Sequence, residues 1–281
     1  MDRGLAGKVC MLTGGTRGIG RAIAQGLASK GAALVLVARD LVRGEAVADE
    51  LRQTTANNEI SVLRGDLGSQ ASLRGLAKEF GRRYDRLHVL VNCAGVLKAR
   101  RELSPDGLEL MFATNHLGYF LLTQLMLERL MTSAPATILN VTAPSTTEPE
   151  FDDLQGERRF RALWAFGATK MENLLFTFAQ ARRLEGSGVT ANAVHPGVAR
   201  TELMRETPMP FRLLTGVLNL FAPSPARGAE DVVAVLSGQE ATANGQFFRR
   251  RESIRAPAYA YDESAQESLW QISLRLCRLQ S

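Results

Sequence analysis

Lysine, cysteine and histidine are scarce in this sequence. Only five of its 34 basic residues are lysines, so a lysine within a motif carries more weight than an arginine would. The three cysteines, Cys10, Cys93 and Cys277, are odd in number and far apart, which argues against a disulfide framework. Three histidines without ligand spacing likewise indicate no metal site. We interpret Cys10 and Cys93 as small hydrophobic residues of buried strands.

Long apolar runs are missing as well. No stretch approaches the ~20 apolar residues that a membrane-spanning helix needs, and Met1 to Leu5 form no apolar signal region. We therefore expect a cytoplasmic protein. Aromatic residues make up 6% of the chain, and its formal net charge of +5 is scattered except for Arg249-Arg250-Arg251. This pattern favours a solvated surface over nucleic-acid binding.

The chain does contain a regular alternation of apolar runs and helical patterns. Its 281 residues, 45% hydrophobic and 22% charged, suffice for one large domain, 1–281. We expect buried strands at 9–12, 32–38, 60–64, 87–91, 137–141 and 189–194, and helices at 21–28, 41–53, 69–80, 115–131 and 161–184, with a short helix opened by Pro105. This alternation predicts an α/β fold of the Rossmann type, a doubly wound parallel sheet with helices on both faces. Its ligands bind beyond the carboxyl ends of the strands.

A glycine-rich stretch, Thr13-Gly14-Gly15-Thr16-Arg17-Gly18-Ile19-Gly20, joins the first strand to the first helix. Its glycines let the backbone turn sharply and approach a ligand closely. The helix that follows offers unpaired N–H groups and the positive end of its dipole to phosphates. The spacing differs from the commoner G-x-G-x-x-G, yet the position between strand and helix predicts a site for a dinucleotide pyrophosphate.

Several motifs occur in the order in which they stand in the short-chain dehydrogenase/reductases. They are Thr13-Gly14-x3-Gly18-Ile19-Gly20, Asp66-Leu67, Asn92-Cys93-Ala94-Gly95, Asn115-His116-x-Gly118, Lys170 and Pro196-Gly197. The stretches 115–123, 153–157, 173–177, 245–248 and 268–270 are similar to the retinol dehydrogenase-like branch in particular. The resemblance covers nearly the whole chain.

This resemblance implies a nicotinamide dinucleotide cofactor, and nearby charges favour its phosphorylated form. Arg39 ends the second strand and Arg17 lies in the glycine loop, and cations suit an adenosine 2′-phosphate. A carboxylate at that place would suit a free ribose hydroxyl, so Asp40, one residue later, argues the other way. We expect NADP(H). By resemblance, the cofactor contacts are Gly14, Thr16, Arg17, Gly18, Ile19, Gly20, Arg39, Asp66, Leu67, Asn92, Ala94, Gly95, Asn115, Lys170, Pro196, Gly197, Val198 and Thr201.

Two members of the family's catalytic set are missing. The resemblance implies an asparagine, a serine, a tyrosine that acts as general acid or base, and a lysine four residues after the tyrosine. Asn115 and Lys170 are present, but Phe166 stands in place of the tyrosine and Ala143 in place of the serine. Phenylalanine has no proton to transfer, and loss of a general acid typically costs ~10²–10⁴ in rate.

Three interpretations follow. The first is a reductase with a substituted acid, or with a substrate such as an iminium that needs hydride but no proton. The second is a module that binds NADP(H) without turnover, and the third is a non-redox enzyme that uses the cofactor as a platform. Thr142 and Ser145 are candidate substitutes for the catalytic serine, although a cofactor contact and a turn cap are their plainer roles.

Other groups that could reach the site are acids and tyrosines elsewhere in the chain. Asp152, Asp153 and Glu157 precede the helix of Lys170, but we interpret them as surface acids. Tyr259 and Tyr261 lie on a C-terminal segment that would have to cross the pocket. His195 is interpreted as a hydrogen-bonded residue at a strand end rather than a base.

Four residues, Ala143, Trp164, Phe166 and Met209, predict an apolar pocket and hence a small apolar organic substrate. The stretch 209–221 is apolar on more than one face, which fits a core helix, a lid, or a patch that contacts a membrane or a partner. We favour a lid within 201–225, because it follows the loop after the sixth strand. The resemblance further implies two-fold packing through the helices of Asn115 and Lys170, as a homodimer or homotetramer.

Overall fold

A computed structural model describes residues 4–197 and 225–280 of the chain. Eight strands form one sheet in the order β3-β2-β1-β4-β5-β6-β7-β8, and every neighbouring pair is parallel except β7 and β8. The strands are β1 Val9–Thr13, β2 Ala33–Ala38, β3 Ile60–Arg64, β4 Val89–Asn92, β5 Ala136–Val141, β6 Val189–Val194, β7 Phe247–Arg249 and β8 Glu252–Ile254. The predicted doubly wound α/β sheet is therefore confirmed.

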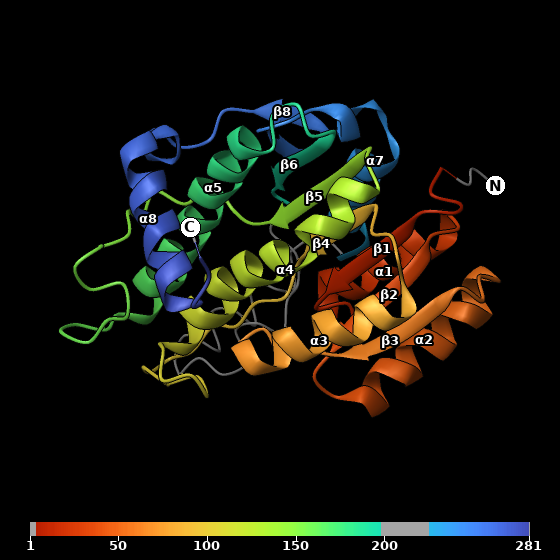
Figure 1. Cartoon of the computed structure of the whole chain (residues 1–281), viewed down its shortest axis with the longest axis horizontal. Coiled ribbons are helices and arrows are strands. Elements are labelled where there is room, and N and C mark those ends of the chain that lie inside the picture. Colours follow the sequence, from red (N-terminus) through yellow and green to blue (C-terminus); the bar gives the residue numbers. More distant parts are fainter. Residues whose placement is uncertain (1–3, 198–224, 281) are drawn as a thin grey trace.

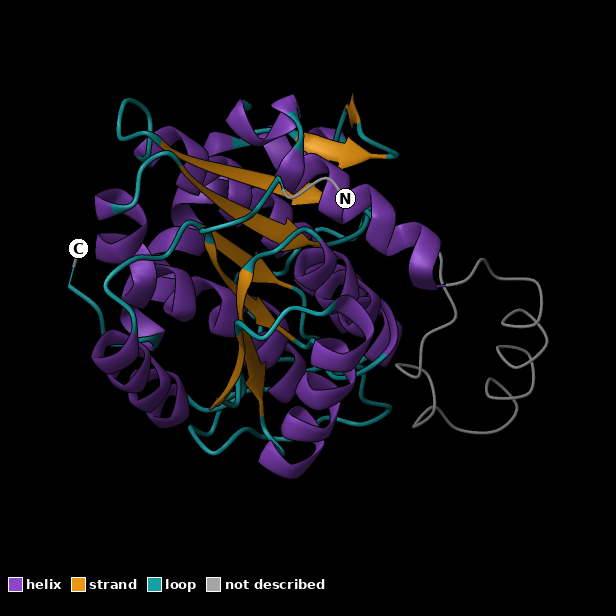
Figure 2. Ribbon diagram, turned by 90° about the vertical axis from the view of Figure 1, so that its right-hand side faces the viewer, coloured by secondary structure: helices purple, strands orange, loops and turns teal. Residues whose placement is uncertain are grey.

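Helices cover both faces of the sheet (Figures 1 and 2). They are α1 Gly18–Ser29, α2 Leu41–Thr55, α3 Gln70–Arg83, α4 Gly118–Thr132, α5 Ala162–Arg183, α7 Pro225–Ser237 and α8 Glu263–Leu276, with a π-helical turn η1 Phe112–Leu117 and 3₁₀ turns η3 Gln239–Thr242 and η4 Ala258–Tyr261. One apolar core joins the sheet to α1, α2 and α7, and a second joins it to α3, α4, α5 and α8. Two cores explain why the inner strands are apolar throughout.

Side-chain caps fix where three of these helices begin. Asp40, Ser69 and Asp262 each accept a hydrogen bond from a backbone N–H three residues later, at α2, α3 and α8. The expected short helix at Pro105 is wrong: the chain turns there, and Leu103 and Glu109 form an isolated antiparallel bridge. The glycine at 107 has φ +76°, which ends any helical run.

The C-terminal helix α8 lies across α4 and α5. Trp270 packs edge-on to Phe120, with ring centroids 5.0 Å apart, and stacks at 6.1 Å on Phe176. Ser273 shares a buried hydrogen bond of 2.9 Å with His116 Nε2. Helix α8 thus covers part of the face of the two helices through which two-fold packing was expected.

The cysteines are free thiols: Cys10 and Cys277 are buried, and Cys93 is partly exposed just after β4. In residues 4–197 and 225–280, no helix has the length and apolar character to span a membrane. The predicted lid at 201–225, apart from Pro225 at the start of α7, lies outside the described residues, as do Val198, Thr201 and Met209.

Candidate functional site

One hydroxyl ties the end of β1 to the end of β4. Thr13 Oγ1 accepts hydrogen bonds from the backbone N–H groups of Cys93 (2.9 Å) and Ala94 (3.2 Å). Gly14 follows with φ +72°, and a Cβ there would lie 2.7 Å from the Ala94 Cα. A Cβ on Gly20 would collide with the Gly14 carbonyl oxygen. Glycine is therefore required at both positions, because backbone packs directly against backbone.

Gly18 is the open position of this loop. It has φ +52°, and no atom lies within 4 Å of the place that a Cβ would take. Helix α1 begins at this residue, and Arg17, its N-cap residue, forms no capping hydrogen bond with its side chain. The N–H groups of the first turn are therefore left for a ligand, and phosphate oxygens suit them. Thr16 and Ile19 flank the opening and are partly exposed.

Two exposed arginines and one hydrogen-bonded carboxylate lie where the adenosine end of the cofactor is expected. Arg17 and Arg39 are both exposed at the carboxyl edge of the sheet, after β1 and at the end of β2. Asp40 accepts a 3.2 Å hydrogen bond from the Arg43 N–H and thereby caps α2. This bond assigns Asp40 a structural role, so the caution that it raised about cofactor choice loses weight.

Asp66 lies just after the carboxyl end of β3, and one of its carboxylate oxygens forms a local hydrogen bond. Its Oδ1 accepts from the Gly68 N–H at 3.0 Å, and its own N–H donates to Ser72 Oγ at 2.9 Å. Leu67 is buried, whereas Asp66 is partly exposed. These bonds hold the Asp66 carboxylate at the edge where the adenine amino group is expected.

Asn92 belongs to a buried polar ladder rather than to an open surface. Its Nδ2 donates to Asn140 Oδ1 (2.9 Å) and Thr123 Oγ1 (3.2 Å), and the side chain is fully buried. Asn140 in turn donates to Thr177 Oγ1 at 2.9 Å. The predicted contact of Asn92 with the cofactor can therefore involve only its backbone atoms. Ala94 and Gly95, which follow it, are partly exposed.

Asn115 sits in the π-helical turn η1, a distortion that is common at functional sites. Its Oδ1 accepts from the Val96 N–H at 2.7 Å, and its Nδ2 donates to the Val96 carbonyl (2.9 Å) and to Thr169 Oγ1 (3.2 Å). The Asn115 carbonyl accepts from Asn173 Nδ2 at 2.9 Å. Asn115 thus joins α5 to the loop after β4 and fixes their relative position.

Lys170 and Phe166 are one helical turn apart on α5 and face each other. The Lys170 Nζ atom lies 5.2 Å from the centroid of the Phe166 ring. Burial lowers the pKa of Lys170 to about 8, an effect that Cys93 partly opposes. Thr142 donates its hydroxyl proton to the Lys170 carbonyl at 2.9 Å, so this hydroxyl positions the lysine's backbone. Asn115, Lys170, Phe166 and Thr142 therefore form one contiguous group through α5.

The Ser145 hydroxyl is also near α5, but it closes a turn. Its Oγ accepts from the Thr147 N–H at 3.2 Å. A Cβ on Gly167 would lie 2.6 Å from Thr147 Oγ1 and 3.3 Å from Ser145 Oγ, so both hydroxyls border the Phe166–Lys170 turn. Ala143 is partly exposed two residues before Ser145. The turn-cap role of Ser145 is the one that its bond shows, whereas the bond of Thr142 is structural and leaves its expected cofactor contact a prediction.

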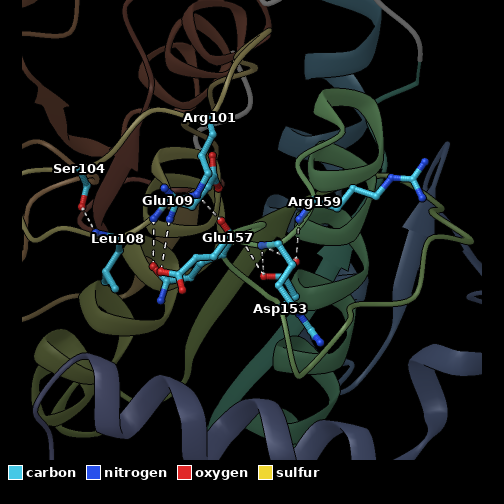
Figure 3. Close-up of polar contacts among 9 residues, drawn as sticks. Arg101, Ser104, Leu108, Glu109, Asp153, Glu157 and Arg159 are labelled. Carbon is cyan, nitrogen blue, oxygen red and sulfur yellow. Dashed lines mark hydrogen bonds and ion pairs between the residues drawn. The ribbon is translucent and has the colours of Figure 1, made fainter.

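Asp153 organises the loop that precedes α5 (Figure 3). Its carboxylate accepts from the backbone N–H groups of Glu157 (2.8 Å), Arg158 (3.3 Å) and Arg159 (3.3 Å). Partial desolvation raises the pKa of Asp153, but these bonds and the Arg158 charge bring it below its usual value. Its interpretation as a surface acid is wrong, because Asp153 is buried and holds the loop together.

Arg101 fastens the same loop to the chain after β4. Its Nε donates to the Gln155 carbonyl at 2.8 Å, and its guanidinium lies 3.5 Å from the Glu157 carboxylate. Figure 3 shows Arg101 and Glu157 on facing segments. Glu157 is therefore engaged at the surface and does not reach Lys170.

The end of β6 supplies His195, Pro196 and Gly197. The His195 Nδ1 is buried without a partner among the described residues. Burial lowers the pKa of His195, the nearby Arg249 and Lys170 charges lower it further, and a bond to the Thr142 backbone opposes them. A Cβ on Gly228 of α7 would collide with the Pro196 carbonyl, so α7 packs closely beneath this segment.

Three of the four tyrosines are bonded to partners other than Phe166 and Lys170. Tyr119 is fully buried and donates its hydroxyl proton to the Ala94 carbonyl at 2.8 Å, which supports the loop from below. Tyr261 stacks on Phe178 at 4.9 Å and accepts from the Ala256 N–H. Tyr84 bonds to Ser61 on β3. Tyr259 is partly exposed on η4, and desolvation and the Glu148 charge raise its pKa.

A small cavity beside α5 is lined by acids that the sequence analysis missed. Trp164 borders it with Glu109, Glu150 and Glu172, whereas Ala143 and Phe166 do not. Glu109 accepts from the Met111 and Phe112 N–H groups, and Glu172 is buried on the adjacent face of α5. Burial raises the pKa of both carboxyls. The Glu109 charge further raises the pKa of Glu172, and the Glu102 charge further raises that of Glu109. Trp164 thus borders an acidic cavity that neither Ala143 nor Phe166 lines.

Comparison with known proteins agrees with this arrangement. The short chain dehydrogenase family profile matches residues 8–209. The chain is 38% identical to "Retinol dehydrogenase 12" of Mus musculus over 279 residues, which are 98% of this chain and 88% of that protein. It is 39% identical to "Retinol dehydrogenase 11" of Homo sapiens over 279 residues, with 98% and 87% of the two chains covered.

Among solved structures, Pseudomonas aeruginosa RhlG in complex with NADP has a similar fold. Its TM-score is 0.71 at 25% sequence identity, and the match covers 88% of this chain and 96% of that one. The chain therefore shares its overall scaffold with a protein that was solved in complex with NADP.

Proposed function

This chain belongs to the short-chain dehydrogenase family, within its retinol dehydrogenase-like branch, and on that basis we propose that it is an NADP(H)-dependent oxidoreductase. Its substrate is a small apolar organic molecule that can be reduced without a proton donor from the protein, such as an iminium or another activated group. The observation that carries this proposal is the pairing of an open glycine loop with Phe166 beside Lys170.

The chain's own geometry fits a bound dinucleotide. Gly18 and the uncapped start of α1 suit the pyrophosphate, and the exposed Arg17 and Arg39 suit an adenosine 2′-phosphate. Asp66 suits the adenine amino group, and Lys170 the nicotinamide ribose. RhlG, which shares the fold, was solved with NADP, and this supports the same cofactor here. When bound, NADPH supplies the hydride.

The chain's residues then position the reacting groups but do not donate a proton to the substrate. Asn115 holds the loop after β4 against α5, and Thr142 holds the Lys170 backbone. Phe166 and Ala143 present no donor where a substrate carbonyl would need one. An unpaired carbonyl there would lose ~1–3 kcal/mol, whereas a substrate that arrives as a cation needs no donor. Proximity alone still lowers the barrier for hydride transfer by several kcal/mol.

A second candidate is an NADP(H)-binding module without turnover. Its support is that Phe166 and Ala143 carry no hydroxyl, and that the nearby Thr142 hydroxyl already donates its proton to the Lys170 carbonyl. The binding elements and the proton-transfer elements are different residues, so the first set can persist without the second.

Stopped-flow absorbance of NADPH at one wavelength separates the two candidates. The protein is mixed with NADPH and a panel of paired substrates, each cyclic ketone beside an N-methylated cyclic iminium ion of the same ring size. The reductase predicts oxidation of NADPH with the iminium ions, which need hydride but no proton, and little with the ketones. The binding module predicts saturable NADPH binding by fluorescence and no oxidation with either member of any pair. No binding of NADPH at all would overturn both candidates.

A further inference from the structure

The hairpin between β7 and β8 turns on two arginines in a strained conformation. Arg249 pairs with Glu252 across the hairpin, which leaves Arg250 and Arg251 as a two-residue turn. Their φ angles are +50° and +68°. Such turns favour asparagine and glycine, because a side chain with a Cβ is disfavoured at positive φ. Backbone strain of this kind is often retained at functional positions.

This turn lies on the same edge of the sheet as the candidate site. Strand β7 is parallel to β6, with Val194 opposite Phe248, and the His195 N–H donates to the Phe248 carbonyl at 2.8 Å. Phe247 packs in the core on the α5 side of the sheet and Phe248 in the core on the other side. Because side chains alternate along a strand, Arg249 faces the α5 side, where Lys170 lies.

Electrostatics place Arg249 and Lys170 around one imidazole. Both positive charges act on His195, which lies between β5 and β7 at the end of β6. Arg249 is therefore a neighbour of the reaction centre rather than of the adenosine end. Arg39 directly follows β2, which lies five strand spacings of ~4.8 Å from β7, or about 24 Å. The turn is thus a basic site separate from the one for a 2′-phosphate.

Two of the three charges lack a counterion among the residues that the structure describes. The Arg251 guanidinium lies 3.6 Å from the Glu240 carboxylate. Arg249 and Arg250 are exposed and form no ion pair with any residue that the structure describes, although Glu252 stands opposite Arg249. Exposed arginines present planar donor sets that match carboxylate and phosphate groups.

We propose that Arg249 and Arg250 bind an anionic group, a carboxylate or a phosphate, at the far end of the substrate. The substrate is then an apolar molecule with a charged end, reactive near Phe166 and Lys170 and anchored at the β7–β8 turn. This inference rests on the proposed function, whose substrate class it narrows.

Calorimetric titration with octyl phosphate, octanoate and octanol tests the inference at saturating NADPH. We expect both anions to bind at least tenfold more tightly than the alcohol. In Arg249→Gln/Arg250→Gln this preference should fall to less than twofold, and NADPH affinity should stay unchanged. Arg82→Gln, an exposed arginine on α3, is the matched control and should keep the preference.

A second variant guards against a purely structural effect. Arg250→Asn/Arg251→Gly gives the turn residues that tolerate its φ angles, so the melting temperature should rise while the affinity for octyl phosphate falls at least fivefold. A rise in stability with unchanged anion affinity would show that the arginines bind nothing. Equal affinity of the wild type for octyl phosphate and octanol would overturn the inference directly.

Two further outcomes distinguish failure of this inference from failure of the proposed function and from binding to a lipid surface. Loss of NADPH binding in the wild type would overturn the proposed function, whereas normal NADPH binding with no anion preference overturns only the present inference. Binding of the wild type and the double variant to phosphatidylglycerol vesicles is measured last. If the double variant loses vesicle binding but keeps its affinity for octyl phosphate, the turn serves a lipid surface and the substrate-anchor inference is wrong.

Discussion

The Lys170 ammonium lies 5.2 Å from the centroid of the Phe166 ring, so the aromatic residue contacts the lysine through its π face. A tyrosine at this position would offer its hydroxyl to the reaction, and phenylalanine offers only the ring. A cation–π contact of this kind contributes ~0.5–2 kcal/mol. Phe166 therefore still positions the lysine but cannot transfer a proton, and this separates cofactor binding from acid catalysis.

Cofactor binding should weaken as the pH rises through about 8. Burial lowers the pKa of Lys170 to about 8, so the side chain is charged below that pH and neutral above it. The neutral amine loses a charge-assisted bond worth ~1.5–3 kcal/mol, which is roughly a 10- to 150-fold loss of affinity. Bound anionic cofactor raises the pKa, so the decline extends upward from pH 8. Fluorescence titration with NADPH between pH 6.5 and 10 measures it.

Lys170→Arg is the control for that titration. Arginine stays charged throughout this range, so its affinity for NADPH should not change between pH 7 and 10. Lys170→Met should bind weakly at every pH. A wild-type affinity that is also constant with pH would show that Lys170 does not contact the cofactor.

Cofactor choice should depend on Arg39. Each charge-assisted contact to a 2′-phosphate is worth ~1.5–3 kcal/mol, so NADPH should bind at least tenfold more tightly than NADH. Arg39→Asp should reverse this order, since a carboxylate accepts from a ribose hydroxyl and repels a phosphate. Calorimetry with both cofactors measures the ratio. Asp40→Asn, which alters only the cap of α2, should leave it unchanged, and equal affinity of the wild type for both cofactors would contradict the prediction.

Much of this architecture follows from the sequence, because local pattern and local structure agree. The run Leu34 to Val37 is apolar throughout and forms an inner parallel strand. The glycine loop lies between β1 and α1 as its spacing predicts. The strands β7 and β8 have three residues each, too few for periodicity to reveal them, and they depend on pairing with β6.

The parts of the site that sequence could not provide depend on distant partners. The sequence suggests a surface acid at Asp153, but in the structure its carboxylate accepts hydrogen bonds from three backbone N–H groups. Glu172 lies within an apolar helix pattern, and only the fold brings it beside Glu109. One signal was available in the sequence, namely a charged residue at a helical position whose neighbours are typical of a core. Of the two acids, this signal indicates only Glu172.

Stability should depend strongly on the contact of α8 with α4 and α5. Trp270 packs against Phe120 and Phe176, and the Arg183 guanidinium lies 4.0 Å above its ring. Trp270→Ala removes these contacts and should cost ~3–5 kcal/mol of unfolding free energy. Urea denaturation measures the loss. Leu163→Ala, an exposed apolar residue on α5, is the control and should change stability by less than ~0.5 kcal/mol.

The same helix bears on oligomeric state. The resemblance to the family predicts two-fold packing through the helices of Asn115 and Lys170, but α8 covers part of that face in the described chain. We therefore expect light scattering to give the mass of a single chain at micromolar concentration. A dimer would contradict this expectation. If Met131→Glu, an exposed position on α4, then left the dimer intact, the dimer would use another surface, whereas its loss would support packing through α4.

Turnover itself should be recoverable. Wild-type protein should bind NADP(H) firmly yet reduce ordinary ketones and retinoid aldehydes very slowly, because Phe166 and Ala143 cannot donate a proton. Ala143→Ser/Phe166→Tyr rebuilds the four-residue set around Asn115 and Lys170, whose positions are fixed by the bonds to Val96 and Thr142. Carbonyl reduction by this variant should rise ~10²-fold or more, with NADPH affinity unchanged.

The single changes make this result specific. Phe166→Tyr alone should recover most of the rate, because the tyrosine supplies the proton and the serine only orients the carbonyl. Ala143→Ser alone should recover little, since no acid is present. Steady-state NADPH oxidation with a simple ketone measures all four proteins. If the wild type already turns over at ~10 s⁻¹, a typical enzyme rate, then another group supplies the proton and lost proton transfer is not the defect.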